Sequence, residues 1–427
     1  MKLSRNGRWL LACAVSIAMV LGVSACGNGT IGYLWVLAGQ SSSNTIGNVI
    51  TGYKIDNNTG NLTEIVHSPF TAGAGGSGAP QYAVVVPGGR YLYTVNLNEA
   101  KNSVVLFSVG GDGVLAAQQE YGTVGATPAW FDLSGNYLYV LDRVSPARDA
   151  SGKAPACTSP TMANNTAPCG SVEVFSVDTT TGLLTPVLNN TIKINNVATS
   201  YFPVGPNPSR IRAVGGSVVV LNGDDTTTIF GASSNGQLTT TANSLQILDQ
   251  SASTNFTSMT TGGSYLYLTD GTHNQINQYT VTNGVLQPGA GSPFANVVPN
   301  TTPVWTLTAS DGTSQNYLYV LNSGSSTANQ GAGSISAYSI DSANGRLTAL
   351  GNVSGSASSN SQYTTGANPV CMVSDPTNRY VYTSNADGTV TGFLRRQGIG
   401  GLSPLRRGSQ FTANGKPTCL VASGITS

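Results

Sequence analysis

Histidine is scarce in this sequence. Histidine is the side chain most often used as a general base, and the 427 residues include only two, His67 and His273. His67 precedes Ser-Pro-Phe, and His273 lies in a polar loop after Asp270-Gly271. Both settings favour a surface position, so each histidine is a weak candidate for a catalytic base.

A second set of candidates lies near the start of a series of extended segments. Many of these segments begin with a proline, and each candidate is the second residue after that position. Its arginine, Arg210, could bind a carboxylate or phosphate through paired N–H groups, or act as a structural donor. Arg212 lies two residues further along the same segment, and for it we favour the role of a structural hydrogen-bond donor. The aromatic members could stack on a sugar ring or simply fill the space between segments. The set comprises Tyr82, Trp130, Arg210, Phe256, Trp305, Cys371 and Cys419.

Several familiar catalytic and ligand-binding motifs are missing. The sequence has no Gly-x-Ser-x-Gly, His-Glu-x-x-His, Walker or Cys-x-x-Cys motif, which leaves serine hydrolase, zinc protease, nucleotide-binding and thioredoxin functions without support. The segments Asp56 to Gly60 and Asp341 to Gly345 lack the full spacing of a calcium loop and suit hairpin turns instead. We therefore expect neither a metal nor a cofactor.

The elements that position these residues come from a repeated unit. A short apolar strand, usually Tyr-Leu-Tyr, follows a Gly or Asn turn and precedes an alternating strand and a turn of the form Asp-x-x-x-Gly-x-Leu. The strand recurs at Tyr33 to Trp35, Tyr91 to Tyr93, Tyr137 to Tyr139, Val218 to Val220, Tyr265 to Tyr267, Tyr317 to Tyr319 and Tyr380 to Tyr382.

Seven repeats of roughly 45 to 65 residues match four short strands each, the size of a β-propeller blade. The predicted fold is therefore all-β, a seven-bladed β-propeller of four-stranded antiparallel blades in one domain over residues 31–427. The first unit lacks an inner strand, and one appears at the other end of the chain after Pro417. We expect this C-terminal strand to complete blade 1. Two insertions, at about 145–168 and 323–333, fall in loops.

The first 30 residues have the layout of a lipoprotein export signal. Lys2, Arg5 and Arg8 precede an apolar run of 14 residues, which as a helix spans about 21 Å and is too short to cross a bilayer. The small residues before Cys26 resemble a bacterial lipobox. We expect residues 1–25 to be removed, Cys26 to carry lipid, and residues 26–30 to form a short linker, although an ordinary secretory signal is the alternative.

This layout predicts a bacterial lipoprotein held at a membrane. Gly27, where some lipoproteins have aspartate, favours the outer membrane, on its periplasmic or surface side. Loss of the signal leaves 16 Lys and Arg against 18 Asp and Glu, so a nucleic-acid partner is not expected. We expect a monomer.

Four cysteines of the mature part suggest disulfide bonds in an oxidising compartment. Cys157 and Cys169 lie in one insertion and are expected to pair. Cys371 and Cys419 each lie two residues after a proline on an inner strand, and blades 7 and 1 adjoin if the ring closes. They could form a second bond across that seam, or they could remain buried free thiols.

The repeats resemble a known family. The segments GGRYLYTVN, SGNYLYVLD, NYLYVLN, IDNNTGNLT and IDSANGRLT, and two copies of SPF, are similar to the seven-bladed lactonase propellers, which include propeller-type 6-phosphogluconolactonase and the carboxymuconate-cyclising enzyme. The resemblance covers the whole mature chain. The seventh unit, at Tyr380 to Asn385, also resembles the Tyr-Val-Thr-Asn repeats of surface-layer proteins.

This resemblance implies hydrolysis of a sugar-type lactone. The family's inner strand often carries Pro-Arg-His, and its tyrosine strand can end in Asn-Glu; the histidine is not matched here, and the nearest glutamate, Glu99, is displaced by two positions. The alternative is a non-catalytic propeller that binds a glycan or protein partner. Under either function, a small sugar-like ligand would lie near Tyr82, Trp130, Arg210, Phe256 and Trp305.

Overall fold

The computed structural model describes residues 29–39, 48–73, 78–97, 102–146, 157, 167–194, 197–240, 244–248, 254–312, 315–324, 332–350 and 362–425. Cys26, the signal segment, Glu99 and most of the two expected insertions lie outside these residues. Among these residues, every regular element of secondary structure is a β-strand. No helix among the described residues is long and apolar enough to cross a membrane.

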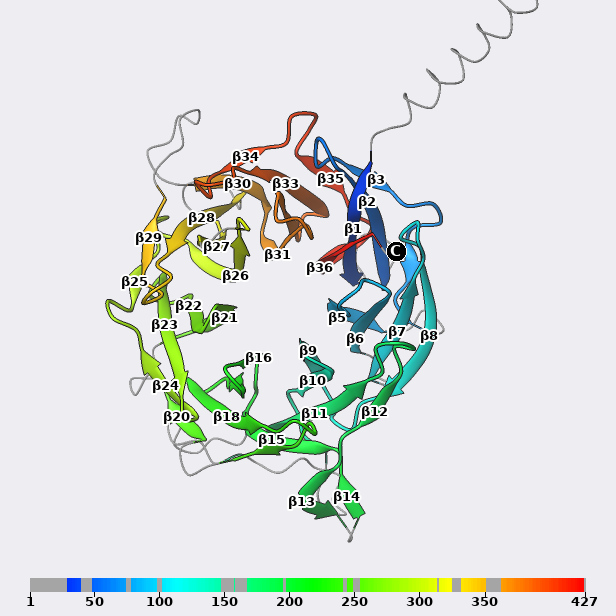
Figure 1. Ribbon diagram of the computed structural model, residues 1–427, viewed down its shortest axis with the longest axis vertical. Coiled ribbons are helices and arrows are strands. Elements are labelled where there is room, and N and C mark those ends of the chain that lie inside the picture. Colours follow the sequence, from blue (N-terminus) through cyan, green and yellow to red (C-terminus); the bar gives the residue numbers. More distant parts are fainter. Residues whose placement is uncertain are drawn as a thin grey trace, which may run out of the picture.

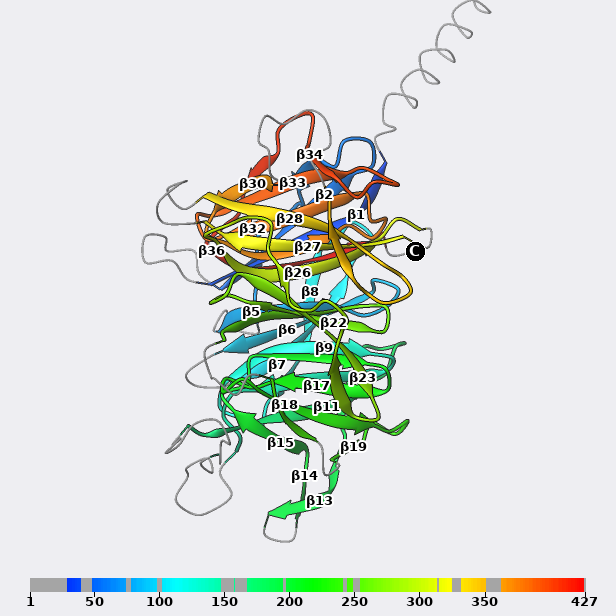
Figure 2. The ribbon, with the colours of Figure 1, turned by 90° about the vertical axis from the view of Figure 1, so that its left-hand side faces the viewer.

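The strands form seven antiparallel sheets around a common centre, which confirms the predicted seven-bladed β-propeller (Figure 1). Figure 2 shows the ring edge on. The innermost strands of blades 1 to 7 are β36 (Lys416–Gly424), β5 (Ala79–Val85), β9 (Pro128–Ser134), β16 (Arg210–Val214), β21 (Phe256–Gly262), β26 (Thr302–Ser310) and β31 (Pro369–Ser374).

The tyrosine strands occupy the second position of every blade. They are β1 (Thr30–Gly39), β6 (Tyr91–Leu97), β10 (Tyr137–Asp142), β17 (Ser217–Leu221), β22 (Tyr265–Asp270), β27 (Asn316–Ser323) and β32 (Tyr380–Asn385). The third strands are β2 (Val49–Asp56), β7 (Ser103–Val109), β11 (Cys169–Val177), β18 (Thr226–Ala232), β23 (Gln275–Thr282), β28 (Ala332–Ile340) and β33 (Thr389–Arg395).

The outer position is a single strand only in blade 2, where it is β8 (Leu115–Gly122). In the other blades two short strands pair with the two ends of the third strand. These are β3 (Leu62–Glu64) with β4 (Phe70–Thr71), β12 (Leu184–Pro186) with β15 (Tyr201–Pro206), β19 (Leu238–Thr239) with β20 (Leu245–Ile247), β24 (Val285–Pro288) with β25 (Phe294–Ala295), β29 (Leu347–Ala349) with β30 (Gln362–Ala367), and β34 (Leu402–Pro404) with β35 (Gln410–Thr412).

The two signatures of the repeat hydrogen-bond to each other between blades. The Tyr267 hydroxyl of blade 5 donates to the Gly345 carbonyl in the turn of blade 6, at 2.7 Å. The bond recurs at other seams, where the donors are Trp35, Tyr93, Tyr319 and Tyr382 and the acceptors are Gly113, Gly182, Gly400 and Gly60. At these five seams a buried hydrogen bond therefore joins one blade to the next, in addition to apolar packing.

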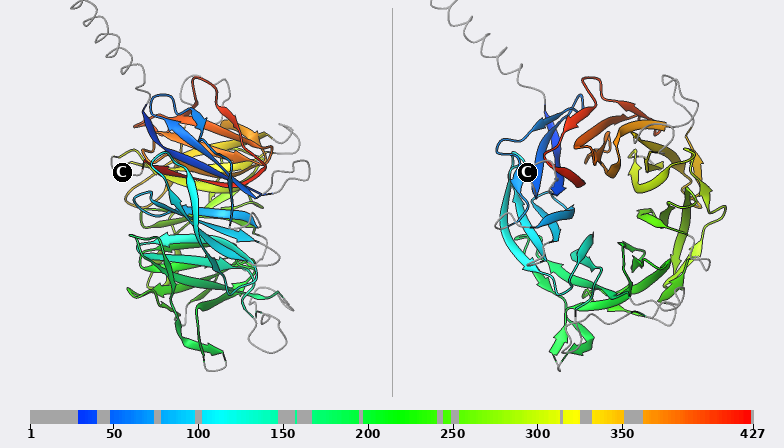
Figure 3. Two further views of the ribbon diagram at one scale, coloured as in Figure 1. Left: turned by 90° about the vertical axis from the view of Figure 1, so that its right-hand side faces the viewer. Right: turned by 180° about the vertical axis from the view of Figure 1, so that it is seen from behind.

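The ring closes through strands from both ends of the chain, as the repeats predicted. β1 pairs with β36, and Leu37 lies opposite Cys419. The first strand (blue) and the last (red) lie side by side in two opposite views (Figures 1 and 3). Cys371 of blade 7 and Cys419 of blade 1 form a disulfide with Cα atoms 5.0 Å apart. Of the two alternatives for these cysteines, the structure has the bond rather than free thiols.

Blade 3 departs most from the regular unit. Cys157 and Cys169 form the expected disulfide, with Cα atoms 4.8 Å apart. The hairpin of β13 (Asn189–Ile194) and β14 (Val197–Thr199) projects beyond the ring (Figure 1). This third insertion was not predicted, because its residues differ little in composition from the turns around it.

Candidate functional site

The inner strands share a bulge that sets their register at the centre of the ring. It lies between Pro80 and Tyr82 in blade 2, and it recurs at the equivalent point in blades 1, 3, 5, 6 and 7. The first residue after the bulge pairs with a residue near the end of the tyrosine strand. In blade 2, for example, Tyr82 pairs with Val95, which is followed by Asn96, and the other blades have Ala, Asn or Asp in the place of Asn96. These aligned residues are Tyr82, Trp130, Arg210, Ser258, Trp305, Cys371 and Cys419.

The register corrects the expected position of Phe256. Phe256 pairs with Asp270, as Pro303 pairs with Asn322 in blade 6, so it occupies the place of the proline. Ser258 takes the aligned position instead. No proline marks this point in blade 5, which removed the sequence landmark by which the other strands could be aligned.

Three aromatic side chains from the aligned set meet at the centre, and we call them the central aromatic cluster. The rings of Tyr82 and Trp130 are stacked with centroids 4.1 Å apart, and Trp305 lies 5.2 Å from Trp130 and 6.1 Å from Tyr82. They come from blades 2, 3 and 6. Their mutual contact fills space between these blades, and Trp130 and Trp305 are each only 7% exposed.

Arg210 lies against this cluster. Its guanidinium carbon is 4.2 Å from the centre of the Trp130 ring, and Nη1 donates to the Ser209 carbonyl at 2.8 Å. Burial, together with the positive charges of Arg212 and Arg143, lowers the pKa of Arg210 to about 10. The side chain therefore remains a cation at neutral pH, stabilised by the aromatic face beneath it.

Two buried donors next to each other have no partner. Among the described residues, neither Nε of Arg210 nor Nε1 of Trp130 makes a hydrogen bond, although both atoms are buried. An unsatisfied buried donor is rare in proteins and costs about 1 to 3 kcal/mol. An acceptor oxygen that reached these two atoms would pair with them.

A carboxylate lies at the next level of the same strands. Asp132 follows Trp130 by two residues on β9, and its Oδ1 is 3.3 Å from Nη1 of Arg212 on β16. Asp132 also accepts a hydrogen bond from the Ala213 backbone N–H at 2.6 Å. Both side chains are largely buried, with 16% of Arg212 and 19% of Asp132 exposed. Burial raises the pKa of Asp132, and the charge of Arg212 opposes this.

Asp132 is not among the residues predicted from the sequence. The available signal was the period of two along a strand, which places Asp132 on the same side as Trp130. The group formed by Trp130, Asp132, Arg210 and Arg212 carries two positive charges and one negative charge. Its net charge favours an anionic ligand or an oxygen atom that gains negative charge.

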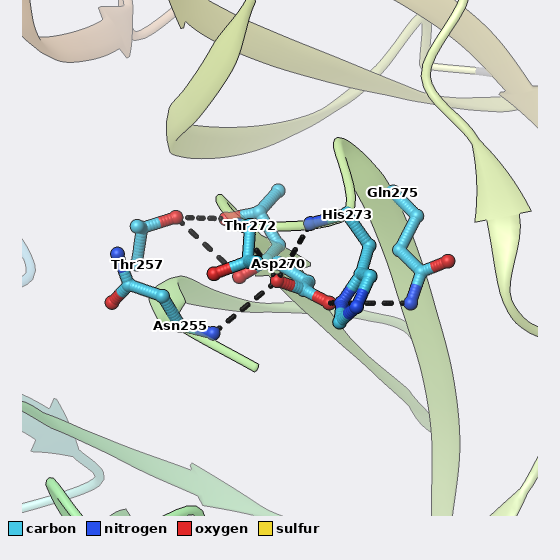
Figure 4. A network of polar contacts seen from close by, with 7 residues as sticks. Asn255, Thr257, Asp270, Thr272, His273 and Gln275 are labelled. Carbon is cyan, nitrogen blue, oxygen red and sulfur yellow. Dashed lines mark hydrogen bonds and ion pairs between the residues drawn. The ribbon is translucent and has the colours of Figure 1, made fainter. Parts of the chain in front are cut away.

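His273 belongs to a separate polar network in blade 5 (Figure 4). Its Nδ1 is 2.6 Å from Oδ2 of Asp270, which is fully buried, while 43% of the histidine side chain is exposed. Asp270 also accepts hydrogen bonds from the backbone of Asn255 and Thr272 and from the Gln275 side chain. The imidazole is thus oriented by a carboxylate, as in many acid–base sites.

Asp270 also has a structural role, which its equivalents in other blades share. Buried Asn or Asp residues occupy this end of the tyrosine strand at Asn96, Asp142, Asn222, Asp270, Asn322 and Asn385. In blade 7, Asn385 donates to the Thr391 hydroxyl at 3.1 Å. The contacts of Asp270 therefore serve mainly to stabilise the turn, as in the other blades. The pair that Asp270 forms with His273 is found in blade 5.

The remaining candidates lie elsewhere. His67 is exposed, has a φ of 67°, and lies in the turn between β3 and β4 at the outer edge of blade 1. The structure therefore does not bring it to the centre. Glu99 lies outside the described residues. In the part of the chain that is described, no cluster of three or more His, Cys, Asp or Glu side chains could hold a metal ion.

Comparisons with known proteins support the fold and the family resemblance. Residues 37–147 match the family model described as "Lactonase, 7-bladed beta-propeller". The periplasmic gluconolactonase of Pseudomonas aeruginosa is similar at 17% identity and a TM-score of 0.65, over 93% of this chain and 100% of that one. A Bacteroides fragilis protein proposed to be a 6-phosphogluconolactonase is similar at 17% identity and a TM-score of 0.65, over 93% of this chain and 99% of that one.

No curated protein matches the sequence. At such low identity the structural neighbours show the fold alone, whereas the match over residues 37–147 also reflects the residues of the first blades. The chain is therefore a seven-bladed β-propeller that resembles the lactonase family, as its repeats predicted.

Proposed function

We propose that the protein hydrolyses a sugar-type lactone at the centre of the ring and is held at a bacterial membrane by lipid on Cys26. The observation that carries the catalytic proposal is the pair of unpaired buried donors, Nε of Arg210 and Nε1 of Trp130. The lactonase-like sequence of residues 37–147 and the activity stated for the Pseudomonas neighbour support it.

The donors suit the oxygen on which charge develops. Attack of water on a lactone carbonyl converts the carbonyl oxygen into an oxyanion, and fixed donors in a dry site stabilise that charge strongly. Arg210 supplies a full positive charge and Trp130 a neutral N–H, and their contact holds both in place. When the ring C–O bond breaks, the leaving oxygen takes up the proton that the base removed from water, and the same donors bind the carboxylate of the product.

The base in this proposal is Asp132. Lactone hydrolysis needs a group that removes a proton from the attacking water, and its pKa must not lie far below the working pH. Burial raises the pKa of Asp132 in that direction, while Arg212 and the Ala213 N–H fix its orientation. The aromatic faces of Tyr82 and Trp305 would contact the carbon skeleton of the sugar.

The two disulfides are typical of a protein outside the cytoplasm. This supports export, and the similar Pseudomonas protein is periplasmic. The lipid anchor and the outer-membrane location are part of the proposal and rest on Cys26 and Gly27.

A non-catalytic binding propeller is the second candidate function. It is favoured by the burial of Trp130 and Trp305 in the central aromatic cluster and by the unmatched histidine and glutamate of the family. The same arginine and aromatic surface would then bind a sugar acid or an acidic glycan without cleaving it.

A proton-release assay with a panel of sugar lactones separates the two functions. If Asp132 is the base, Asp132→Asn should abolish hydrolysis while binding of the corresponding sugar acid remains. Arg210→Ala should weaken that binding by about 1.5 to 3 kcal/mol, the range for a hydrogen bond to a charged group. The matched control is Arg90→Ala, which removes an exposed arginine from blade 2.

Circular dichroism would confirm that each variant keeps its fold. Hydrolysis no faster than the uncatalysed reaction with every lactone would remove the catalytic proposal. Retained binding of the sugar acid in that case would favour the binding propeller.

A further inference from the structure

A pocket of about 760 Å³ lies at the seam between blades 7 and 1, away from the central site. Asn58 and Thr59 line it from the turn after β2, and four arginines line it from blade 7. The arginines are Arg379, Arg396, Arg406 and Arg407.

The charge of this pocket is not balanced by its own lining, which includes no carboxylate. The ion pairs found among the described residues do not involve its arginines. The nearby Asp56 carboxylate, though partly desolvated, has a lowered pKa because Thr59 and Asn58 donate hydrogen bonds to it and Arg407 is close. Asp375 is a second acid close to the lining, because its carboxylate accepts a hydrogen bond from the Tyr380 N–H at 2.6 Å. Two carboxylates beside four guanidiniums leave the pocket with a net positive charge.

One of the four arginines is held by the seam itself. Arg379 donates to the backbone carbonyl and side-chain oxygen of Asn57, at 3.0 and 3.1 Å, and lies against the Tyr380 ring. Arg406 and Arg407 are exposed in the turn that follows β34. The pocket thus combines one arginine held by hydrogen bonds with two exposed arginines.

The pocket lies where the chain enters the ring. The Gly29 carbonyl accepts a hydrogen bond from the Asn57 N–H at 2.8 Å, next to the lining residue Asn58. Cys26 precedes Gly29 by three residues, which span at most about 10 Å. In Figure 1, β1 begins beside β3 and β35, at this seam. A lipid on Cys26 would therefore bring the pocket close to the membrane surface.

We propose that this pocket binds the phosphate groups of anionic phospholipids and so orients the propeller on the membrane. Arginine binds phosphate through paired N–H groups. The acyl chains on Cys26 would anchor the protein, and the pocket would determine which face of the propeller lies against the membrane. The inference uses the proposed anchor only to bring the two surfaces together. Binding to headgroups is measurable without any acyl chain.

The test is co-sedimentation with vesicles made of about one part phosphatidylglycerol to three parts phosphatidylethanolamine. The full chain carries Cys26→Ser, so that lipid on Cys26 does not contribute. A basic residue near an anionic surface typically strengthens binding about five-fold. The Arg406→Ala/Arg407→Ala variant should therefore bind these vesicles roughly 30-fold more weakly.

The matched control is Arg90→Ala/Arg346→Ala. It removes two exposed arginines from turns on the same face of the ring, in blades 2 and 6, and has the same net charge as the test variant. Near-normal binding of this control supports a specific pocket. Equal losses in the two double variants would overturn the proposal, because they would indicate a general effect of charge.

Two further arms distinguish the source of the phosphate. Neutral phosphatidylcholine vesicles should bind the parent chain and the pocket variant equally. Inorganic phosphate, titrated by calorimetry, should bind weakly in the absence of vesicles. If the pocket binds phosphate tightly while vesicle binding does not depend on Arg406 and Arg407, it is a site for a soluble anion, and the membrane proposal is wrong.

Discussion

A buried acid pair in blade 3 should make the stability of the protein depend on pH. Glu173 on β11 is 2% exposed and accepts hydrogen bonds from the Val124 N–H at 3.0 Å and the Ser200 hydroxyl at 3.1 Å. Asp142 on β10 is fully buried. Burial raises the pKa of Glu173 to about 7, and burial together with the charge of Glu173 raises the pKa of Asp142.

The size and sign of the effect follow from the Glu173 pKa. Its ordinary value is 4.5, and one pKa unit is worth about 1.4 kcal/mol, so the difference corresponds to about 3 kcal/mol. Below pH 4.5 both folded and unfolded chains hold the Glu173 proton, so this group does not lower the free energy of unfolding. Between pH 4.5 and about 7 the unfolded chain loses its proton first, so the free energy of unfolding falls. Above about pH 7 the loss is complete.

Glu173→Gln removes this dependence while preserving the hydrogen bonds. The amide oxygen can accept from the Val124 N–H, and the amide nitrogen can donate to the Ser200 oxygen. We expect the variant to be more stable than the parent by up to about 3 kcal/mol at pH 8, with little difference near pH 4.5. Removing the charge of Glu173 also lessens the repulsion on Asp142, which acts in the same direction.

Urea unfolding at a series of pH values, with both disulfides intact, measures the difference. The control is Glu64→Gln, an exposed glutamate on β3, which should leave the pH profile unchanged. A parent and a Glu173→Gln variant whose unfolding free energies stay parallel from pH 4.5 to 8 would refute the argument, because the glutamate would then ionise equally in both states.

Three further outcomes are expected. Replacing Cys371 and Cys419 by serine should lower the free energy of unfolding by about 4 kcal/mol in the chain-entropy model, since their separation is 48 residues; a change under 1 kcal/mol in urea would contradict this. Gly345→Ala should destabilise more than Gly263→Ala, because both glycines have positive φ but a Cβ at Gly345 would lie 2.5 Å from the Tyr265 ring, whereas Gly263 has open space; equal melting temperatures would exclude the clash. Cys26→Ser should move the protein out of the detergent-rich phase, and continued partitioning there would show that Cys26 is not the anchor.

Much of the fold was determined by local sequence. Tyr-Leu-Tyr strands and Asp-x-x-x-Gly-x-Leu turns recur because each blade must bury both faces. At five seams the strand and the turn also hydrogen-bond to each other, as Tyr267 does with Gly345. The number of repeats fixed the number of blades. The inner strand missing from the first repeat and present at Pro417 predicted how the ring closes, and the shared register of Cys371 and Cys419 allowed their disulfide.

The candidate site depended on tertiary structure. Phe256 was assigned to the wrong level because strand register is set by pairing, and blade 5 has no proline to mark it. The contact between Trp130 and Trp305 joins residues 175 positions apart and exists only after the ring closes. The ion pair of Asp132 with Arg212 likewise joins two blades. Alternation along a strand predicts which side a residue faces, but which side chains meet at the centre depends on the curvature of the whole ring, to which every seam between blades contributes.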